Sequence, residues 1–174
     1  MKLDIPSSQL AADLNSISRL IMVVVACFVL SACAGSPARI AHMSQAELDQ
    51  LTAVELCNAY AINRGDNVRR ALIARDAELR ELAEQGLPDP VTGTPPRPAF
   101  TEREWEAIDQ RQVFIGMSEV AMICAWGLPN IYAGGAINQT VTDRETSRQY
   151  VFRQMSARAN YVYVRDGYVY AIQN

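Results

Sequence analysis

Apolar and polar positions follow three different patterns along the chain. Residues 20–30 form an uninterrupted apolar run, apolar residues recur at helical spacing between 44 and 126, and apolar and polar residues alternate from 148 onward. Helical spacing indicates amphipathic helices, and alternation indicates half-buried strands. We therefore expect an α+β fold, in which helices pack on a small antiparallel β-meander.

The first predicted helix begins at a clear start signal. Ser44 and Thr52 each open a capping box, in which a hydroxyl and a glutamate three residues further on satisfy the free N–H groups of a helix start. Apolar side chains then continue to about Tyr60. The helix is expected over 44–60, either continuous or broken at Thr52.

A second helix and a proline-rich segment complete the helical region 44–86. The helix is expected over 68–85, with Asp76 and Arg80 paired four residues apart on its solvated face. The segment 87–100 (LPDPVTGTPPRPAF) contains five prolines, which exclude regular structure. We interpret it as a linker before a C-terminal domain.

The C-terminal domain, 101–174, is predicted to open with two short helices. The sequence TERE at 101–104 is a third capping box and starts the first of them. Ser118 caps the second, and Gly127-Leu128-Pro129 ends it. Glycine can adopt the left-handed conformation of a helix end, and proline cannot continue the helix.

The rest of the domain is predicted to be β structure. One strand is expected over 148–153, and two more flank Asp166-Gly167, a strong signal for a two-residue hairpin turn. Such a turn would place Tyr163 opposite Tyr170 and divide the hairpin into two faces. One face would carry Val162, Val164, Val169 and Ala171, and the other Tyr161, Tyr163, Arg165, Tyr168, Tyr170 and Ile172.

The two hairpin faces have different expected roles. The valine face should pack against the helices. Tyrosine is enriched in the cores of protein interfaces, so Tyr161, Tyr163, Tyr168 and Tyr170 are candidate partner-binding residues. Alternatively, the chain's own helices cover these side chains, or they form a cross-strand ladder.

The apolar run 20–30 predicts export. It is too short to cross a membrane, which takes about 20 residues, but it fits the apolar part of a signal peptide and follows Arg19. The sequence Leu30-Ser31-Ala32-Cys33 resembles the lipobox of bacterial lipoproteins. The resemblance implies a signal peptide over 1–32, cleavage between Ala32 and Cys33, and a lipid on Cys33. A plain secretory signal and a buried helix are the alternatives.

The residues after the lipobox bear on localisation. In lipoproteins of this kind, aspartate after the lipidated cysteine retains the protein at the inner membrane. Ala34 stands there, so the resemblance implies the periplasmic face of the outer membrane. We expect 33–43, which contains the only histidine, His42, to be a flexible tether.

Charge and cysteine content narrow the possibilities further. The chain has 16 basic and 19 acidic residues and no basic stripe, which argues against nucleic-acid binding. Of its four cysteines, Cys27 would leave with the signal peptide and Cys33 would carry the lipid. Cys57 and Cys124 could then form a disulfide in an oxidising periplasm, or remain two separate buried thiols.

No catalytic or metal-binding pattern stands out in the sequence. His42 lies in the expected tether, and Cys57 and Cys124 have no histidine nearby with which to bind zinc. The carboxylates cluster with arginines on predicted helices, which is typical of a solvated face. We therefore expect no catalytic residue, no cofactor and no metal site.

The region 101–172 resembles the BamE-like (SmpA/OmlA) small outer-membrane lipoproteins. Ile115-Gly116-Met117-Ser118, Gly127-Leu128-Pro129 with its glycine eleven positions after the first, and the strand sequence at 150–154 carry the resemblance. It implies a small domain of helices on an antiparallel sheet. Members of this family assist the machinery that inserts β-barrels into the outer membrane, and a similar fold occurs in proteinaceous inhibitors of β-lactamase.

These observations together predict a non-enzymatic, lipid-anchored envelope protein. It would act as a binding or scaffold module in outer-membrane protein assembly or envelope integrity. Its expected partners are the membrane, through palmitate and the other acyl chains on Cys33, and another envelope protein, but no nucleic acid. The alternative is a periplasmic inhibitor or immunity-type protein that binds an enzyme through the same sheet.

Overall fold

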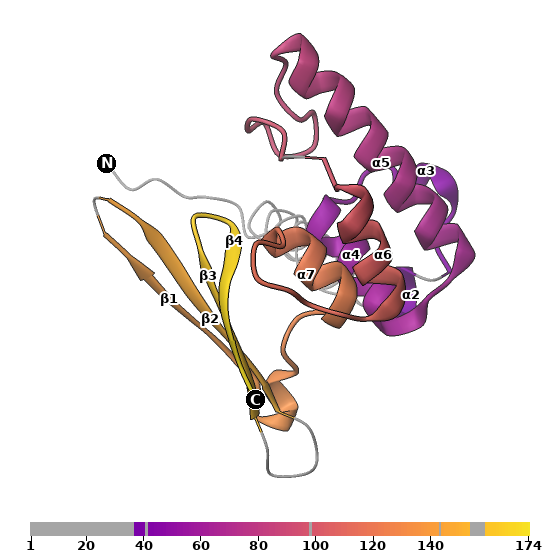
Figure 1. Cartoon of the computed structure of the whole chain (residues 1–174). Helices are drawn as coiled ribbons and strands as arrows, with labels where there is room; N and C mark the ends of the chain where they lie inside the picture. Colours follow the sequence, from indigo (N-terminus) through magenta and orange to yellow (C-terminus); the bar gives the residue numbers. More distant parts are fainter. Residues whose placement is uncertain (1–36, 41, 98, 143, 154–158) are drawn as a thin grey trace, which may run out of the picture. The chain divides into compact units, whose positions relative to one another are not determined.

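The computed structural model describes residues 37–174, apart from 41, 98, 143 and 154–158. In this part of the chain, helices pack on one face of a four-stranded antiparallel sheet (Figure 1). The predicted α+β class is confirmed. The signal peptide 1–32, its cleavage site and the lipidated Cys33 lie outside the described residues. None of the described helices is long and apolar enough to span a membrane.

The prediction of a flexible tether over 33–43 is wrong from residue 37 onward. Helix α2 (Pro37–Ile40) packs against α4 (Ala53–Asn63). Ile40 is only 1% exposed, and Met43 is partly buried against the same core. These two apolar side chains attach the segment to the folded unit, whereas His42 is exposed.

The helical region 44–86 contains α3 (Gln45–Leu48), α4 and α5 (Asp66–Gln85). Of the two possibilities for 44–60, the break at Thr52 is the one present, because Thr52 caps α4. Its hydroxyl accepts a hydrogen bond from the Glu55 N–H at 3.2 Å, and its own N–H donates to the Glu55 carboxylate at 2.9 Å. Helix α5 begins slightly earlier than predicted.

The buried face of α5 contains charged residues as well as apolar ones. Val68, Leu72 and Leu79 are buried as expected, but Arg75 and Asp76 are buried with them. Asp76 does lie 3.7 Å from Arg80, yet it is not on a solvated face. The prediction for Asp76 is wrong because residues far away in the sequence bind its carboxylate.

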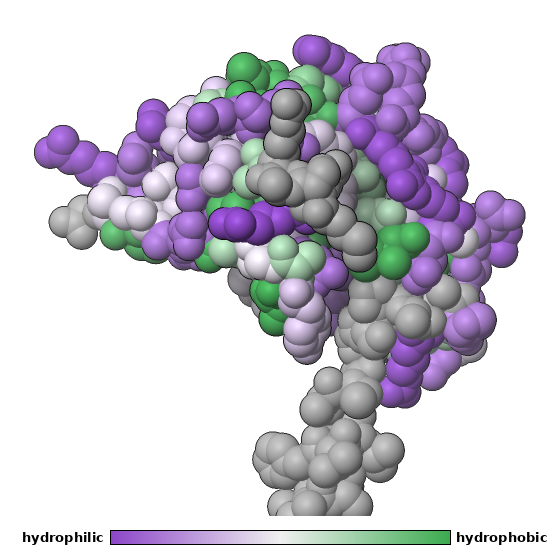
Figure 2. All heavy atoms as spheres, turned by 90° about the horizontal axis from the view of Figure 1, so that it is seen from below, coloured by the Kyte–Doolittle hydropathy of each residue, from purple (hydrophilic) through white to green (hydrophobic). Residues whose placement is uncertain are grey.

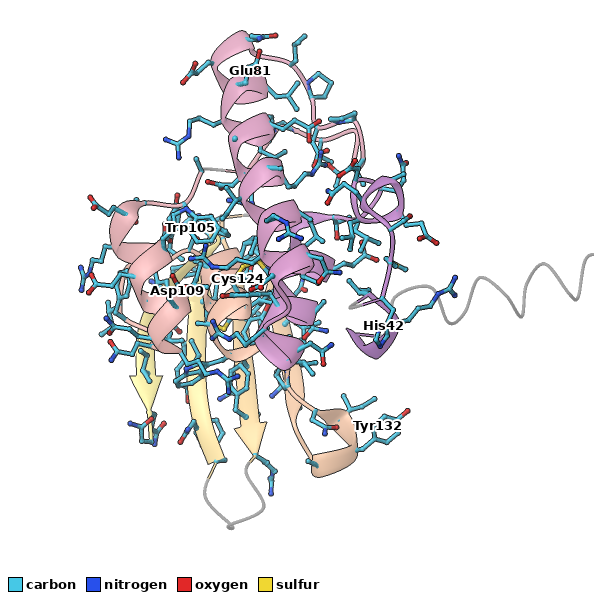
Figure 3. All side chains as sticks on the ribbon, turned by 90° about the vertical axis from the view of Figure 1, so that its right-hand side faces the viewer. His42, Glu81, Trp105, Asp109, Cys124 and Tyr132 are labelled. Carbon is cyan, nitrogen blue, oxygen red and sulfur yellow. A yellow bond between two sulfur atoms is a disulfide. The ribbon has the colours of Figure 1, made fainter. Side chains whose placement is uncertain are left out.

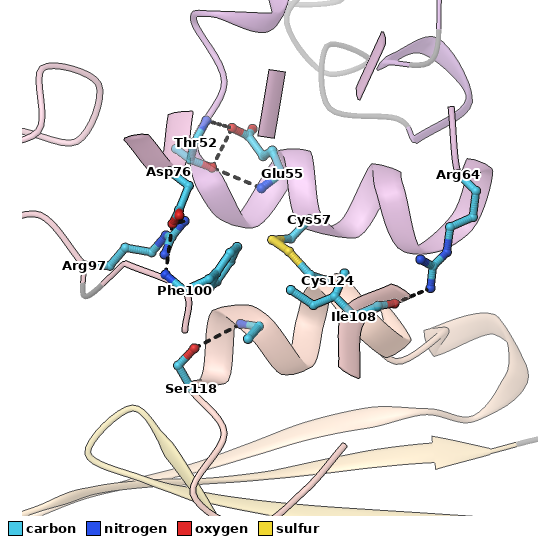
Figure 4. The surroundings of a disulfide bond; sticks show 11 residues. Thr52, Glu55, Cys57, Arg64, Asp76, Arg97, Phe100, Ile108, Ser118 and Cys124 are labelled. Carbon is cyan, nitrogen blue, oxygen red and sulfur yellow. Dashed lines mark hydrogen bonds and ion pairs between the residues drawn. A yellow bond between two sulfur atoms is a disulfide. The ribbon is translucent and has the colours of Figure 1, made fainter. Parts of the chain in front are cut away.

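Those distant residues belong to the proline-rich segment 87–100. Asp76 accepts hydrogen bonds from the Arg97 guanidinium at 2.8 Å and from the Phe100 N–H at 3.1 Å (Figure 4). Asp89 forms a buried ion pair with Arg75. The segment is therefore fixed along α5, and residues 37–174 form one compact unit without a linker. Proline excludes regular structure here but leaves side chains free to form ion pairs.

A disulfide joins the two halves of the helical layer. The C-terminal half of the layer contains α6 (Glu102–Gln110) and α7 (Glu119–Trp126). Cys57 of α4 and Cys124 of α7 are both fully buried and bonded to each other (Figure 4). Of the two alternatives for these cysteines, the disulfide is the one present.

The sheet is a simple meander in the order β1-β2-β3-β4. A short 3-10 helix, η1 (Ile131–Ala133), precedes β1 (Ala136–Val141), which the sequence did not predict. The strands β2 (Thr146–Arg153), β3 (Ala159–Arg165) and β4 (Tyr168–Gln173) correspond to the predicted ones. The first strand lacks apolar alternation because both of its faces are exposed.

The hairpin between β3 and β4 contains an irregularity that the sequence did not indicate. Arg165 pairs with Tyr168 as predicted, but a β-bulge follows, and Tyr163 pairs with Ala171 instead of Tyr170. One extra residue on β4 reverses the faces beyond it. Ile172 therefore packs against the core and Ala171 lies on the opposite face, the reverse of the prediction.

One face of the sheet packs on the helical layer. Val162, Val164 and Val169 are buried against the helices, as predicted. The carboxylate of Glu119, in the first turn of α7, reinforces this contact by accepting from Arg148 at 2.5 Å and from the Tyr150 hydroxyl at 2.6 Å. Burial and the bond to Glu119 raise the pKa of Tyr150, so its hydroxyl stays protonated.

Candidate interaction surface

The candidate site is the outer face of the sheet, the face opposite the helical layer. The described α-helices all lie on the other side (Figures 1 and 3). Strand register assigns ten side chains to this outer face: Asn138, Thr140, Ser147, Gln149, Val151, Tyr161, Tyr163, Arg165, Ala171 and Gln173. Tyr170, at the bulge, joins them beside Tyr163. Of these residues only Val151 is buried. The outer face is polar and aromatic, with few aliphatic residues.

A hydrogen-bonded row of side chains crosses the outer face from β1 to β4. Asn138 donates to Gln149 at 2.8 Å, and Gln149 donates to the Tyr163 hydroxyl at 3.1 Å. The Tyr163 hydroxyl in turn donates to Gln173 at 3.3 Å. Each of the four strands contributes one side chain, so the row fixes Tyr163 at the centre of the face. Tyr163 is therefore part of a cross-strand ladder.

The exposed part of the outer face lies next to this row. The Tyr170 ring lies 6.1 Å from the Tyr163 ring, and the Arg165 guanidinium stands 4.6 Å from the centre of the Tyr170 ring. Arg165 also lies 3.4 Å from Glu145. Tyr170 is 42% exposed, so an aromatic ring and a cation are both open to solvent.

The four candidate tyrosines do not form one group. Tyr161, Tyr163 and Tyr170 share the outer face. Tyr168 is exposed too, but it borders a separate hollow of about 380 Å³ at the start of β4, together with Phe114 and Ser118. The structure therefore separates Tyr168 from the other candidates.

Sequence reasoning missed a second exposed aromatic region, around η1. Ile131 and Tyr132 are largely exposed, and Figure 3 shows Tyr132 pointing away from the body of the molecule. A hollow of about 510 Å³ nearby is lined by Trp126 and Phe152, whose rings meet edge to face, together with Arg153. Figure 2 views this side and shows apolar and strongly hydrophilic patches next to each other. The only sequence signal was two apolar residues in a glycine-rich loop.

Among the described residues, no cluster of three or more histidine, cysteine, aspartate or glutamate side chains could hold a metal ion. The buried carboxylates described above are engaged by arginines or backbone N–H groups. What the outer face offers is hydrogen-bonding and aromatic contact area, which suits recognition.

The chain was also compared with known proteins. No family model, no curated protein and no solved structure matches it.

Proposed function

We propose that this chain is a non-enzymatic, lipid-anchored envelope protein that binds another envelope protein through the outer face of its sheet. The observation that carries the proposal is the exposed pair Tyr170 and Arg165 beside the fixed Tyr163 ring. Tyrosine and arginine are among the residues that contribute most binding energy at protein interfaces.

The hydrogen-bonded row supports a binding role in a second way. A side chain that is already held in place loses little rotamer freedom when a partner docks, and this loss is a major cost of association. Tyr163 is held by Gln149 and Gln173 before any partner arrives. The centre of the face is thus preorganised, while Tyr170 and Arg165 remain accessible.

The anchor part of the proposal rests on the sequence Leu30-Ser31-Ala32-Cys33. Metabolic labelling with a palmitate analogue should mark the wild-type chain and leave a Cys33→Ser variant unlabelled. Equal labelling of both chains would exclude a lipid on Cys33. Membership of the BamE-like family remains a prediction, and it would make a barrel-assembly subunit the partner.

The binding face is tested by photo-crosslinking in cells. A photoreactive phenylalanine replaces Tyr170 in the full chain, and the matched control carries it at Ile73 of α5, which is equally exposed at 43%. We expect one recurrent envelope protein attached through position 170 and not through position 73. Identical adducts at both positions, or none, would contradict the proposal. A soluble enzyme as the only adduct would favour an inhibitor instead.

A further inference from the structure

The two edge strands of the sheet, β1 and β4, differ in what lies beside them. The chain itself covers the start of β4 on the side away from β3: Gly116 N–H donates to the Val169 carbonyl at 2.7 Å, Val169 N–H donates to the Met117 carbonyl at 2.8 Å, and Glu119 N–H donates to the Gly167 carbonyl at 2.8 Å. Within the described residues, no strand pairs with the outer side of β1. In this part of the chain, β1 is therefore the edge strand that is open along its whole length.

The backbone groups on this open edge follow from the register. Both the carbonyl and the N–H of Thr146 engage Asp166, on the side of β3, at 2.9 and 3.1 Å. Thr146 is opposite Val141. In an antiparallel pair, when the N–H and carbonyl of one residue point away from the partner strand, those of the residue opposite it do the same. The N–H and carbonyl of Val141 therefore face the side of β1 away from β2. By alternation, those of Gln139 and Ile137 do the same.

The edge has none of the usual protections against strand pairing. Exposed edge strands commonly have a charged residue, a proline or a bulge. The sequence of β1, AINQTV, has no charge and no proline, and its register with β2 is regular. Ile137 and Val141 on the same strand are 46% and 64% exposed. The outward N–H and carbonyl groups of Ile137, Gln139 and Val141 thus lie beside two exposed apolar side chains.

We propose that β1 pairs antiparallel with β1 of a second copy of this chain, about a two-fold axis at Gln139. The order of apolar and polar residues in β1 is symmetric about Gln139, because Ile137 and Val141 lie two positions before and after it. Gln139 would face its own copy, and Ile137 would face Val141 of the second copy, so that apolar side chains meet apolar ones. All six outward backbone groups of each strand would form hydrogen bonds, and the two four-stranded sheets would become one.

The symmetry of the pattern favours a second copy over a foreign strand. A foreign partner needs no such symmetry, whereas a two-fold interface requires the strand to complement itself. The proposal does not depend on the tyrosine face or on the lipid. A six-residue edge buries less than the roughly 1,200–2,000 Å² of stable complexes, so the association should be weak and best detected by cross-linking.

The experiment compares two cysteine variants of the full chain. In a hydrogen-bonded antiparallel pair the Cα atoms lie about 5.5 Å apart, which permits a disulfide, so Gln139→Cys should cross-link to its copy. Thr140→Cys is the matched control, because the proposed register would separate its two copies by about 8 Å. Each variant and the wild type are purified in detergent, oxidised with copper–phenanthroline and run on non-reducing gels.

We expect a dimer band for Gln139→Cys only, with melting temperatures unchanged for both variants. Equal dimer bands for both cysteine variants, or no dimer for Gln139→Cys, would each overturn the proposal. A second test adds Ile137→Lys and Val141→Lys to Gln139→Cys, which should abolish the dimer. Mixing this chain with one that carries Ile137→Glu and Val141→Glu together with Gln139→Cys should restore it, since opposite charges then meet.

Discussion

At the scale of single residues, Glu104 joins the start of α6 to the start of α7. Its carboxylate accepts hydrogen bonds from the Thr101 N–H at 2.9 Å and from the Ser118 N–H at 2.7 Å. Burial raises the pKa of Glu104, but the hydrogen bonds from Thr101 and Ser118 outweigh it. They hold the pKa below its ordinary value of 4.5.

Because its pKa is lowered in the folded state, Glu104 stabilises the fold at pH values above 4.5. This contribution is lost as the pH falls through the folded-state pKa. We expect Glu104→Gln to lower the free energy of unfolding by about 1–3 kcal/mol at neutral pH. Urea titrations should show less difference between variant and wild type in acid. Glu84→Gln, at an exposed site of α5, is the control and should have little effect.

Substitutions at Val164 and Tyr170 test which face of the β3–β4 hairpin belongs to the core. Val164 is 1% exposed, so Val164→Asp buries an unpaired charge and should cost several kcal/mol, about 3 or more. Tyr170→Ala, at an exposed position, should change stability by no more than about 1 kcal/mol. Thermal melting measures both. A large loss of melting temperature for Tyr170→Ala would mean that the outer face is part of the core.

At the scale of elements, local signals predicted more than distant ones. The capping boxes at Thr52 and Thr101 and the turn at Asp166 depend on residues within three positions of each other, and all three are present. The burial of Asp76 depends on Arg97 and Phe100, more than twenty residues away. No local pattern contains that information.

The disulfide is the strongest long-range connection between elements. It closes a loop of 67 residues between α4 and α7, for which chain entropy suggests a stabilisation of about 4 kcal/mol. We expect a chain with Cys57→Ala and Cys124→Ala to unfold at a clearly lower urea concentration. A reductant should shift the wild type toward the same midpoint and leave the variant unchanged. A wild type insensitive to reductant would show that the bond contributes nothing.

The outer face of the sheet was only partly predictable, because part of it depends on contacts between residues on different strands. Alternation along β3 placed Tyr161 and Tyr163 on one face. The row through Asn138 and Gln149 requires a strand that shows no alternation and a register that no turn signal fixes. The bulge before Ala171 depends on how β4 packs, which a hairpin pattern does not contain.

At the scale of the whole molecule, the ordered segment 87–100 makes the helical region and the sheet parts of one unit. We expect them to unfold together. Fluorescence of Trp105 and Trp126, in α6 and α7, should change at the same urea concentration as far-UV circular dichroism, which also reports α4 and α5. Two separate transitions would mean that the proline-rich segment joins independent domains after all.

The backbone of Gly116–Glu119 has a further consequence, for growth of the sheet. Three hydrogen bonds from this short segment occupy the beginning of the β4 edge, so in the part of the chain that the structure describes, a new strand can pair along its whole length only at the other edge. A pair of chains joined there has used both of its fully open edges, whereas a sheet fully open at both edges can add subunits indefinitely and form fibres. A few residues of irregular backbone thus oppose further growth of this sheet.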